Sequence, residues 1–204
     1  MITIVDYGLG NIRAFLNVYK RLNIEARAVT TPDALDGATK IILPGVGHFD
    51  HAMERLDASG MRERLDTLVL ERKLPVLGIC VGMQMLAQTS DEGSREGLGW
   101  LAGHVRSFRS RESSAALPMP HMGWNDVKPV SSHPLFAQLE ADSRFYFLHS
   151  YFFETAVDSD QLAVASYGAD FACAVHHENI FGVQFHPEKS HHFGTRLLQN
   201  FAEL

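Results

Sequence analysis

A cysteine between two glycines, Cys80 in a Gly-x-Cys-x-Gly segment over residues 78–82, has the setting of a catalytic nucleophile. The apolar residues 74–77 before it predict a short buried strand, and residues 83–88 after it predict a helix. The flanking glycines permit the strained strand-to-helix turn of a nucleophile elbow, with sulfur in place of the serine oxygen. Cys80 would then stand at the head of a helix, where the dipole and free N–H groups favour a thiolate. The alternative is a small buried thiol, the common environment of a free cysteine.

A histidine and an acid that could serve Cys80 stand two positions apart, at His186 and Glu188. Residues 180–185 predict a strand that delivers His186 at its end, and residues two apart in extended backbone point to the same side. Glu188 could therefore orient the imidazole and stabilise its charged form, with Pro187 stiffening the pair. The alternative is a surface histidine at the end of an ordinary strand. Because covalent catalysis by cysteine needs a base and the base needs an orienting group, the three residues together favour a triad.

A glycine-rich loop supplies candidates for binding the developing oxyanion. Residues 44–47, Pro-Gly-Val-Gly, follow a predicted buried strand, and ligands of such sheets bind at the carboxyl ends of strands. The N–H groups near Val46 and Gly47, together with that of Val81, could hold the oxyanion of a tetrahedral intermediate. Because glycine permits opposite peptide orientations, the loop could also act as a switch. The alternative is a tight turn without a catalytic role.

Composition limits the possible partners and location. The chain has 204 residues, 46% hydrophobic and 21% charged, which fits one globular domain spanning 1–204. A net charge of −6 argues against nucleic acid or an anionic membrane as the main partner. No apolar stretch approaches the ~20 residues of a membrane span, and the first residues lack the basic start of a signal peptide. Two cysteines, Cys80 and Cys173, make no disulfide framework, so a reducing cytoplasm is the expected location.

The order of predicted elements indicates an α/β fold. In the first half, strands at residues 2–5, 25–29, 40–43 and 74–77 alternate with helical patterns at 12–22 and 53–68, as in a parallel sheet. In the second half, strands at 144–148, 161–167, 172–176 and 180–185 are closely spaced, with a hairpin turn at Glu178-Asn179, which favours antiparallel pairs. Residues 93–103 and 110–120 are predicted loops, Cys173 is a predicted core residue, and a last helix begins near Ser190.

The elbow, the glycine loop and the His-Pro-Glu segment together resemble those of the class I (triad) glutamine amidotransferases, over nearly the whole chain. Further segments narrow the resemblance to the glutaminase subunits of imidazole glycerol phosphate synthases: residues 7–11, 43–47, 120–125, 148–151 and 182–190. Pro-His-Met-Gly-Trp-Asn at 120–125 is the most specific of these. Val81 stands where leucine is usual, and His191 where glutamine is frequent. Neither belongs to the triad, although His191 could alter a partner-facing surface.

The resemblance implies a fold, a reaction and further site residues. The fold is a single-domain three-layer sandwich with a mostly parallel central sheet and an antiparallel C-terminal portion. The reaction is hydrolysis of glutamine to glutamate and ammonia, without cofactor or metal. Gln84 would bond the amino-acid end of glutamine and Glu92 would lie near its ammonium group, against the alternatives of a solvent-facing helix residue and an ordinary loop acid. The other implied pocket residues are Gly45, His149, Ser150 and Tyr151.

The same resemblance implies a partner. Ammonia would pass to a cyclase subunit with a (β/α)8 barrel, which forms a heterodimer with this chain and makes imidazole glycerol phosphate and AICAR ribotide in histidine biosynthesis. Candidates for contacts with that subunit are Asn11, Trp124 and Lys189, against the alternatives of a buried core tryptophan and a solvated lysine. The glutaminase subunit of another synthase, such as pyridoxal phosphate synthase, is the alternative assignment.

Three rival functions are weaker. Gly8-Leu9-Gly10 follows the first strand as in a dinucleotide fingerprint, but Arg13 stands where the third glycine is required. Histidines gather in the C-terminal third and could indicate zinc, but His191 and His192 fall on the last helix and His186 is better used as the base. A non-enzymatic binding module on the same fold is disfavoured by the complete triad.

Overall fold

The computed structural model describes residues 1–139 and 143–204 of the chain. Its main sheet begins with parallel strands in the order β2, β1, β3, β4 and β13, and continues with β12, β10, β6 and β5. Strands β12, β10 and β6 pair antiparallel. The bounds of the parallel strands are Ala26–Val29 (β2), Ile2–Val5 (β1), Lys40–Gly45 (β3), Val76–Cys80 (β4) and Ile180–Val183 (β13). The predicted mixed sheet, parallel in its first half, is therefore confirmed.

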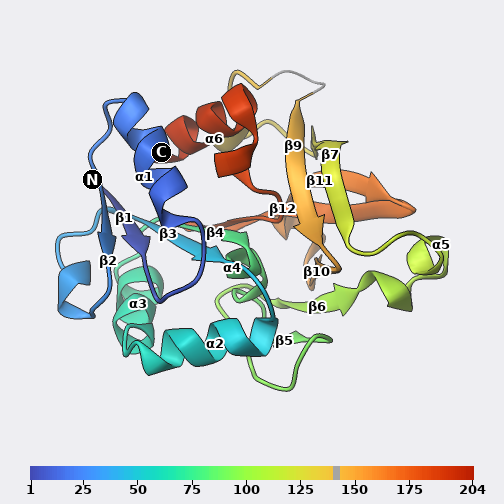
Figure 1. Cartoon of the computed structure of the whole chain (residues 1–204), viewed down its shortest axis with the longest axis horizontal. Helices are drawn as coiled ribbons and strands as arrows, with labels where there is room; N and C mark the ends of the chain where they lie inside the picture. The colour runs from blue at the N-terminus through green and yellow to red at the C-terminus, as the bar shows by residue number, and fades with distance from the viewer. Residues whose placement is uncertain (140–142) are drawn as a thin grey trace.

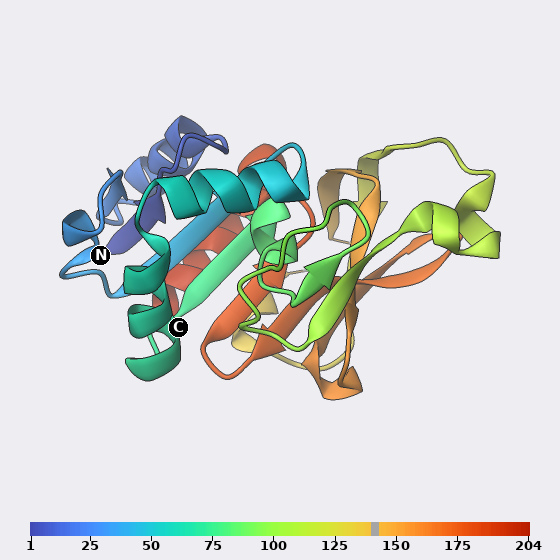
Figure 2. The same cartoon turned by 90° about the horizontal axis from the view of Figure 1, so that it is seen from below.

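Helices cover both faces of the parallel strands, which gives three layers. Helices α1 (Ile12–Arg21) and α6 (His191–Glu203) lie on one face, and α2 (Phe49–Ala58) and α3 (Arg62–Asp66) lie on the other (Figures 1 and 2). Each apolar helical stripe that the sequence predicts is buried against the sheet, through residues such as Phe15, Met53 and Leu197. The α3 helix continues as one wider turn, Thr67–Glu71 (η2).

Beyond β13 the sheet continues with strands that pair antiparallel, except that β5 pairs parallel with β6. They are β12 (Ala169–His177), β10 (Tyr151–Thr155), β6 (Gly103–Ser107), β5 (Thr89–Ser90), β11 (Gln161–Tyr167) and β8 (Lys128–Pro129). The predicted β12–β13 hairpin is confirmed, with Val175 opposite Gly182. The short helical segments are α4 (Val81–Gln84), α5 (Glu112–Ala115), η1 (Asp33–Leu35), η3 (Phe108–Ser110), η4 (Pro134–Phe136), η5 (Asp158–Asp160) and η6 (Pro187–Lys189).

A separate two-stranded sheet lies beside this half of the molecule. It pairs β7 (His121–Asp126) antiparallel with β9 (Arg144–His149) (Figure 1). The strand β9 is close to the prediction, but β6, β7 and β10 were not predicted as strands. In β6 and β7, glycine, histidine and polar residues interrupt the apolar pattern, and β10 offers only three aromatic residues before Glu154 and Thr155. Pairing with partners distant in sequence, such as Phe153 of β10 opposite Val105 of β6, forms them instead.

Parallel pairing brings the carboxyl ends of β3, β4 and β13 to one edge of the sheet. Gly45 pairs with Cys80, and Val183 pairs with Ile79. The glycine loop follows β3, the elbow follows β4, and His186 follows β13, so segments far apart in sequence meet at this edge. The fold therefore assembles the three predicted parts of the site in one place.

Candidate active site

Cys80 is the last residue of β4, and α4 begins directly after it. Its backbone has φ 55° and ψ −114°, a strained conformation for a residue with a side chain and one typical of a nucleophile on a sharp strand-to-helix turn. Gly82 makes this turn possible, because a Cβ there would lie 1.9 Å from the carbonyl oxygen of Leu43 on β3. The predicted elbow is present, and Cys80 is 4% exposed at the wall of a cavity.

The helix after Cys80 is shorter than predicted. It spans one turn, Val81–Gln84, whereas the prediction was a helix over residues 83–88. The carbonyl groups of residues 85–88 accept hydrogen bonds from N–H groups of residues 97–101, which takes them out of a continuing helix. The predicted position of Cys80 at the head of a helix is confirmed, since Cys80 is the N-cap of α4, but so short a helix aligns few peptide groups and has a weak dipole. Two polar groups contact the sulfur directly: Gln184 Nε2 lies 3.8 Å from Cys80 Sγ, and the carbonyl oxygen of Leu148 lies 3.9 Å from it.

His186 reaches the site from beyond β13, the parallel neighbour of β4. Its N–H donates to the carbonyl of Tyr146 at 2.8 Å, and its carbonyl accepts from Ser190 Oγ at 2.6 Å, so its backbone is held on both sides. Its Nδ1 lies 3.0 Å from Glu188 Oε1, with both side chains buried. The predicted pairing is confirmed, but the turn Pro187–Lys189 produces it and not extended backbone.

The pKa of His186 shows how its two partners act. Burial by itself would lower this pKa, but hydrogen bonds with Cys80 and Glu188 and the negative charges of both raise it to about 10. Since Nδ1 faces Glu188, Nε2 is the ring nitrogen left for Cys80. The resting site therefore holds an imidazolium beside the sulfur, with the proton already positioned for a leaving group.

A cavity of about 310 Å³ lies in front of Cys80. Most of the residues singled out in the sequence line it: Val46, Gly47, Cys80, Val81, Gln84, Glu92, His149, Ser150, Tyr151, His186 and Lys189, with Pro120 and Leu148 in addition. Gly45 does not line it. A Cβ on Gly45 would lie 2.4 Å from the backbone nitrogen of Gly82, so this glycine allows β3 to pack closely against the elbow.

Gln84 is buried at the cavity wall with its amide group fixed. Its Nε2 donates to the carbonyl of Tyr151 at 3.2 Å and to Gln184 Oε1 at 3.0 Å. Both amide hydrogens are thereby used, and Oε1 is left to accept from a ligand in the cavity. The alternative of a solvent-facing helix residue is wrong, because Gln84 is 2% exposed.

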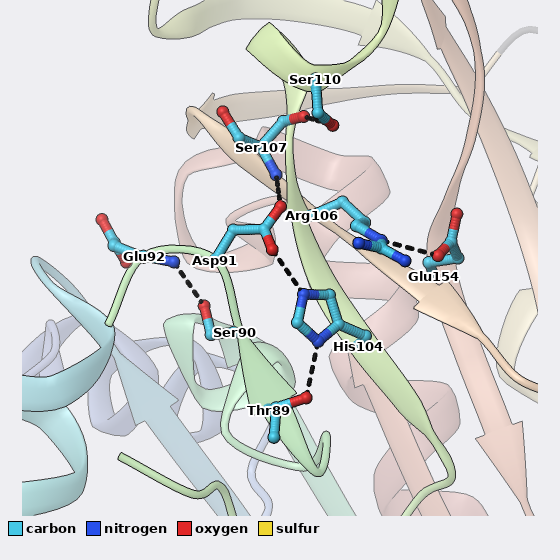
Figure 3. Close-up of polar contacts among 9 residues, drawn as sticks. All are labelled: Thr89, Ser90, Asp91, Glu92, His104, Arg106, Ser107, Ser110 and Glu154. Carbon is cyan, nitrogen blue, oxygen red and sulfur yellow. Dashed lines mark hydrogen bonds and ion pairs between the residues drawn. The ribbon is translucent and has the colours of Figure 1, made fainter. Parts of the chain in front are cut away.

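Glu92 lies on a loop that is tied to the protein on two sides. Its Oε2 accepts from the N–H of Phe49, the first residue of α2, at 2.9 Å. The neighbouring Asp91 points the other way and bonds His104 Nε2 at 2.6 Å and the N–H of Ser107 at 3.0 Å, both on β6 (Figure 3). Burial raises the pKa of Glu92, so this carboxylate gains from a cation placed beside it. The contact with Phe49 holds the Glu92 side chain at the cavity wall.

The candidate partner residues are all exposed at the surface, and Lys189 also lines the cavity. Trp124 is 45% exposed and stacks on His191 with 5.2 Å between ring centroids, so the alternative of a buried core tryptophan is wrong. Lys189 is exposed at the cavity rim, with Nζ 5.8 Å from the centroid of Tyr146. Asn11 is exposed in the turn that precedes α1.

Comparison with known proteins gives the family. Residues 3–204 match the family described as Glutamine amidotransferase class-I. The chain belongs to this family. It is 63% identical to the "Imidazole glycerol phosphate synthase subunit HisH" of Bdellovibrio bacteriovorus and 52% identical to that of Leptospira interrogans, each over 100% of both chains. A solved glutamine amidotransferase shares the fold, with a TM-score of 0.77 and 22% identity over 99% of this chain and 97% of the other.

The described residues contain neither a cluster of metal-binding side chains nor a helix that could span a membrane. Within residues 1–139 and 143–204, no group of three or more histidine, cysteine, aspartate or glutamate side chains is arranged to hold a metal ion. Over the same ranges, no helix is both long enough and apolar enough to cross a membrane.

Gln184 is the site residue that was not singled out in the sequence. It is completely buried, donates toward Cys80 Sγ and accepts from Gln84. The available signal was its position two residues before His186 at the end of a predicted strand, where alternate residues point to the same side. A glutamine in an otherwise apolar strand end is also an unusual core residue, which needs a polar partner.

Proposed function

We propose that this chain is the glutaminase subunit of an imidazole glycerol phosphate synthase. It hydrolyses the side-chain amide of glutamine and supplies the ammonia to a cyclase subunit in histidine biosynthesis. The observation that carries this proposal is the Cys80, His186 and Glu188 constellation at a cavity, in a chain that matches HisH relatives over its full length. The triad by itself supports amide hydrolysis. The assignment of glutamine as the substrate and of the synthase rests on the similarity to the relatives.

The first half of the reaction uses the proton that His186 holds. The Cys80 thiolate attacks the side-chain carbonyl carbon of glutamine, and a tetrahedral oxyanion forms. When the carbon–nitrogen bond breaks, His186 Nε2 gives its proton to the departing nitrogen, which leaves as ammonia. The sulfur is then part of a thioester and carries no charge. Because the charge and hydrogen bond of Cys80 are among the causes that raise the pKa of His186, this pKa falls on acylation.

The second half uses the neutral imidazole as a base. A water molecule attacks the thioester carbonyl while His186 Nε2 takes one of its protons. The second tetrahedral intermediate expels the sulfur as thiolate, glutamate leaves, and the imidazolium and thiolate are restored. Glu188 stays bound to Nδ1 throughout and keeps the ring in the required orientation.

The cavity walls supply the remaining roles. The N–H groups of Val46, Gly47 and Val81 bind the oxyanion, a role supported by the position of these residues in the wall of the cavity that Cys80 also lines. Gln84 Oε1 and the Glu92 carboxylate accept from the ammonium group of glutamine. Ser150 and Tyr151 also line the pocket, and their main-chain groups contact the substrate in this proposal. No cofactor or metal takes part in these steps.

The cyclase subunit, a (β/α)8 barrel, covers the cavity in the heterodimer. The outer face of the β7–β9 sheet supports this position, because it leaves Met122 64%, Trp124 45% and Leu148 37% exposed directly beside the cavity that Leu148 also lines. Exposed apolar side chains that adjoin one another mark protein interfaces. Lys189 and Asn11 lie at the rim of the contact.

The test separates the two chemistries of the complex. The chain with its cyclase partner should release glutamate from glutamine and form imidazole glycerol phosphate. Ammonium salt at high pH should support the synthesis without this chain. Purification of the chain with the pyridoxal phosphate synthase barrel in place of the cyclase would overturn the assignment, and so would a requirement for glutamine when ammonia is supplied.

A further inference from the structure

A line of hydrogen bonds, with a buried contact between two histidines at its middle, runs along the inner face of the β7–β9 sheet and ends at the glutamine cavity. His121 and His149 are opposite one another in the pairing of these strands. His121 Nδ1 lies 2.9 Å from His149 Nε2, and His149 Nδ1 lies 2.7 Å from the carbonyl oxygen of Tyr151. At the other end, Asn125 Nδ2 lies 3.2 Å from His121 Nε2. We call Asn125, His121 and His149 the histidine chain.

The Asn125 end of the histidine chain determines where the protons are. The N–H of Asp126 donates to Asn125 Oδ1 at 2.9 Å, so the amide oxygen is on that side. Asn125 Nδ2 donates to the carbonyl of Ser166 at 2.9 Å and therefore also points its second hydrogen toward His121 Nε2. That nitrogen must accept, so the proton of His121 is on Nδ1 and is donated to His149.

The Tyr151 end gives the same answer independently. A carbonyl oxygen accepts only, so His149 must carry its proton on Nδ1 and must accept at Nε2 from His121. Every donor in the histidine chain then meets an acceptor, with both rings neutral. An added proton on His149 would set two N–H groups against each other. Burial lowers the pKa of His121 to about 4 and that of His149 to about 3, which agrees with this neutral state.

The histidine chain is linked to the catalytic residues through the carbonyl oxygen of Tyr151, and to the outer surface through strand β7. The carbonyl oxygen of Tyr151 also accepts from Gln84 Nε2, which in turn bonds Gln184 beside Cys80. Neighbouring residues of β7, Met122 and Trp124, point to the opposite face and are exposed there. A shift of β7 therefore displaces the inner residues His121 and Asn125 together with the outer ones.

We propose that His121 and His149 are positioning residues, held in a single Nδ1–H tautomer, that set the place of the Tyr151 carbonyl and of Gln84 for glutamine binding. His121 lies behind His149, which lines the cavity, and both act through Tyr151 and Gln84. This inference rests on the proposed glutaminase function. It makes the β7 strand the element through which contact at the outer surface reaches the substrate pocket.

Two substitutions of His121 separate positioning from packing, because its ring also stacks on Tyr167 and Phe147, with centroids 4.3 and 5.0 Å away. His121→Phe keeps the stacked ring and removes the donor to His149. His121→Asn leaves a gap but places an amide N–H where Nδ1 was. In the complete complex we expect His121→Phe to raise the KM for glutamine about tenfold with little change in kcat. The KM of His121→Asn should stay closer to that of the unsubstituted complex. The reverse order would overturn the proposal, since it is the order that packing alone produces.

A measurement on the unsubstituted chain needs no variant that must fold. Nitrogen-15 NMR of the imidazole groups should show both His121 and His149 as Nδ1–H tautomers, the minority form of a free histidine side chain, without titration from pH 5 to 8. An Nε2–H signal for His149 would overturn the proposal. If the unsubstituted complex does not hydrolyse glutamine, the proposed function fails. If that complex is active and His121→Phe equals it in KM, only the positioning role fails.

Discussion

At the scale of single residues, Cys80 and Cys173 have opposite environments. Cys80 lines the cavity beside His186, whereas Cys173 is fully buried in β12 and burial raises the pKa of its thiol. We expect Cys80→Ala to reduce glutamine hydrolysis by ~10⁴-fold or more while ammonia-dependent synthesis by the complex continues. An electrophilic glutamine analogue should label Cys80 and spare Cys173, as peptide mass spectrometry would show. Substantial glutamine turnover by the Cys80→Ala chain would contradict the triad.

The bond between Glu188 and His186 predicts a pH-dependent stability. The pKa of His186 is raised in the folded chain to about 10 from ~6.5 in the unfolded chain. A raised pKa stabilises the fold fully below the unfolded value, and this contribution is lost as pH rises through the folded value. Glu188→Gln should therefore lower the free energy of unfolding by about 1–3 kcal/mol at pH 6.5 and by clearly less at pH 10.

Urea unfolding at the two pH values measures this difference, and the exposed pair of Glu178 with Lys73 offers a matched control. Glu178→Gln should change stability little at either pH, because exposed ion pairs contribute little. An equal loss at pH 6.5 and pH 10 for Glu188→Gln would show that the His186 charge does not carry the effect.

At the scale of elements, Glu92 joins the substrate pocket to the oxyanion loop. It caps the first N–H of α2, and α2 starts directly after the loop that contains Val46 and Gly47. Glu92→Gln keeps an oxygen for Phe49 but loses the charge, so we expect a KM for glutamine raised about tenfold and kcat near normal. Glu92→Ala loses both, so kcat should also fall about tenfold. Steady-state assays of the complex distinguish the variants, and equal kcat values would show that the cap does not hold the loop.

Asp91→Asn is the matched control for this element. Asp91 is next in the chain to Glu92 but bonds His104 and Ser107 on β6, away from α2 (Figure 3). Its substitution should loosen the loop on the β6 side only. We expect smaller changes in both KM and kcat than Glu92→Ala produces. A larger change would show that the contacts with β6, and not the contact with α2, hold the pocket in place.

At the scale of the whole molecule, the exposed face of the β7–β9 sheet predicts how strongly the partner binds. Trp124→Ala should weaken binding of the cyclase subunit by roughly 10- to 100-fold, since a large aromatic side chain at the centre of an interface carries much of the binding energy. Leu70→Ala, a similarly exposed apolar residue on η2, is the control and should leave binding unchanged. Calorimetric titration gives the dissociation constant of each variant. Equal affinities would show that the interface does not include Trp124.

The closed heterodimer also predicts coupled activity. The isolated chain should hydrolyse glutamine slowly, and the cyclase subunit with its nucleotide ligand should raise kcat more than it lowers KM. Lys189→Ala should weaken this coupling and spare ammonia-dependent synthesis, because Lys189 lies at the cavity rim. Equal kcat values for the chain alone, with partner, and with partner and ligand would show that the site is preformed.

The sequence by itself determined the chemistry and most of the first half of the fold. Cys80, His186 and Glu188 were identifiable from two local features. Their residue types are those that covalent catalysis needs, and their glycine or proline neighbours are those that the local turns need. The strands β1, β3 and β4 were identifiable because strands buried on both faces are continuously apolar. Tertiary structure alone decided the length of the elbow helix, whose end carbonyls bond residues 97–101. It also decided the strands β6, β7 and β10 and the places of Gln184 and His121, because partners distant in sequence form their hydrogen bonds and no local pattern records such pairings.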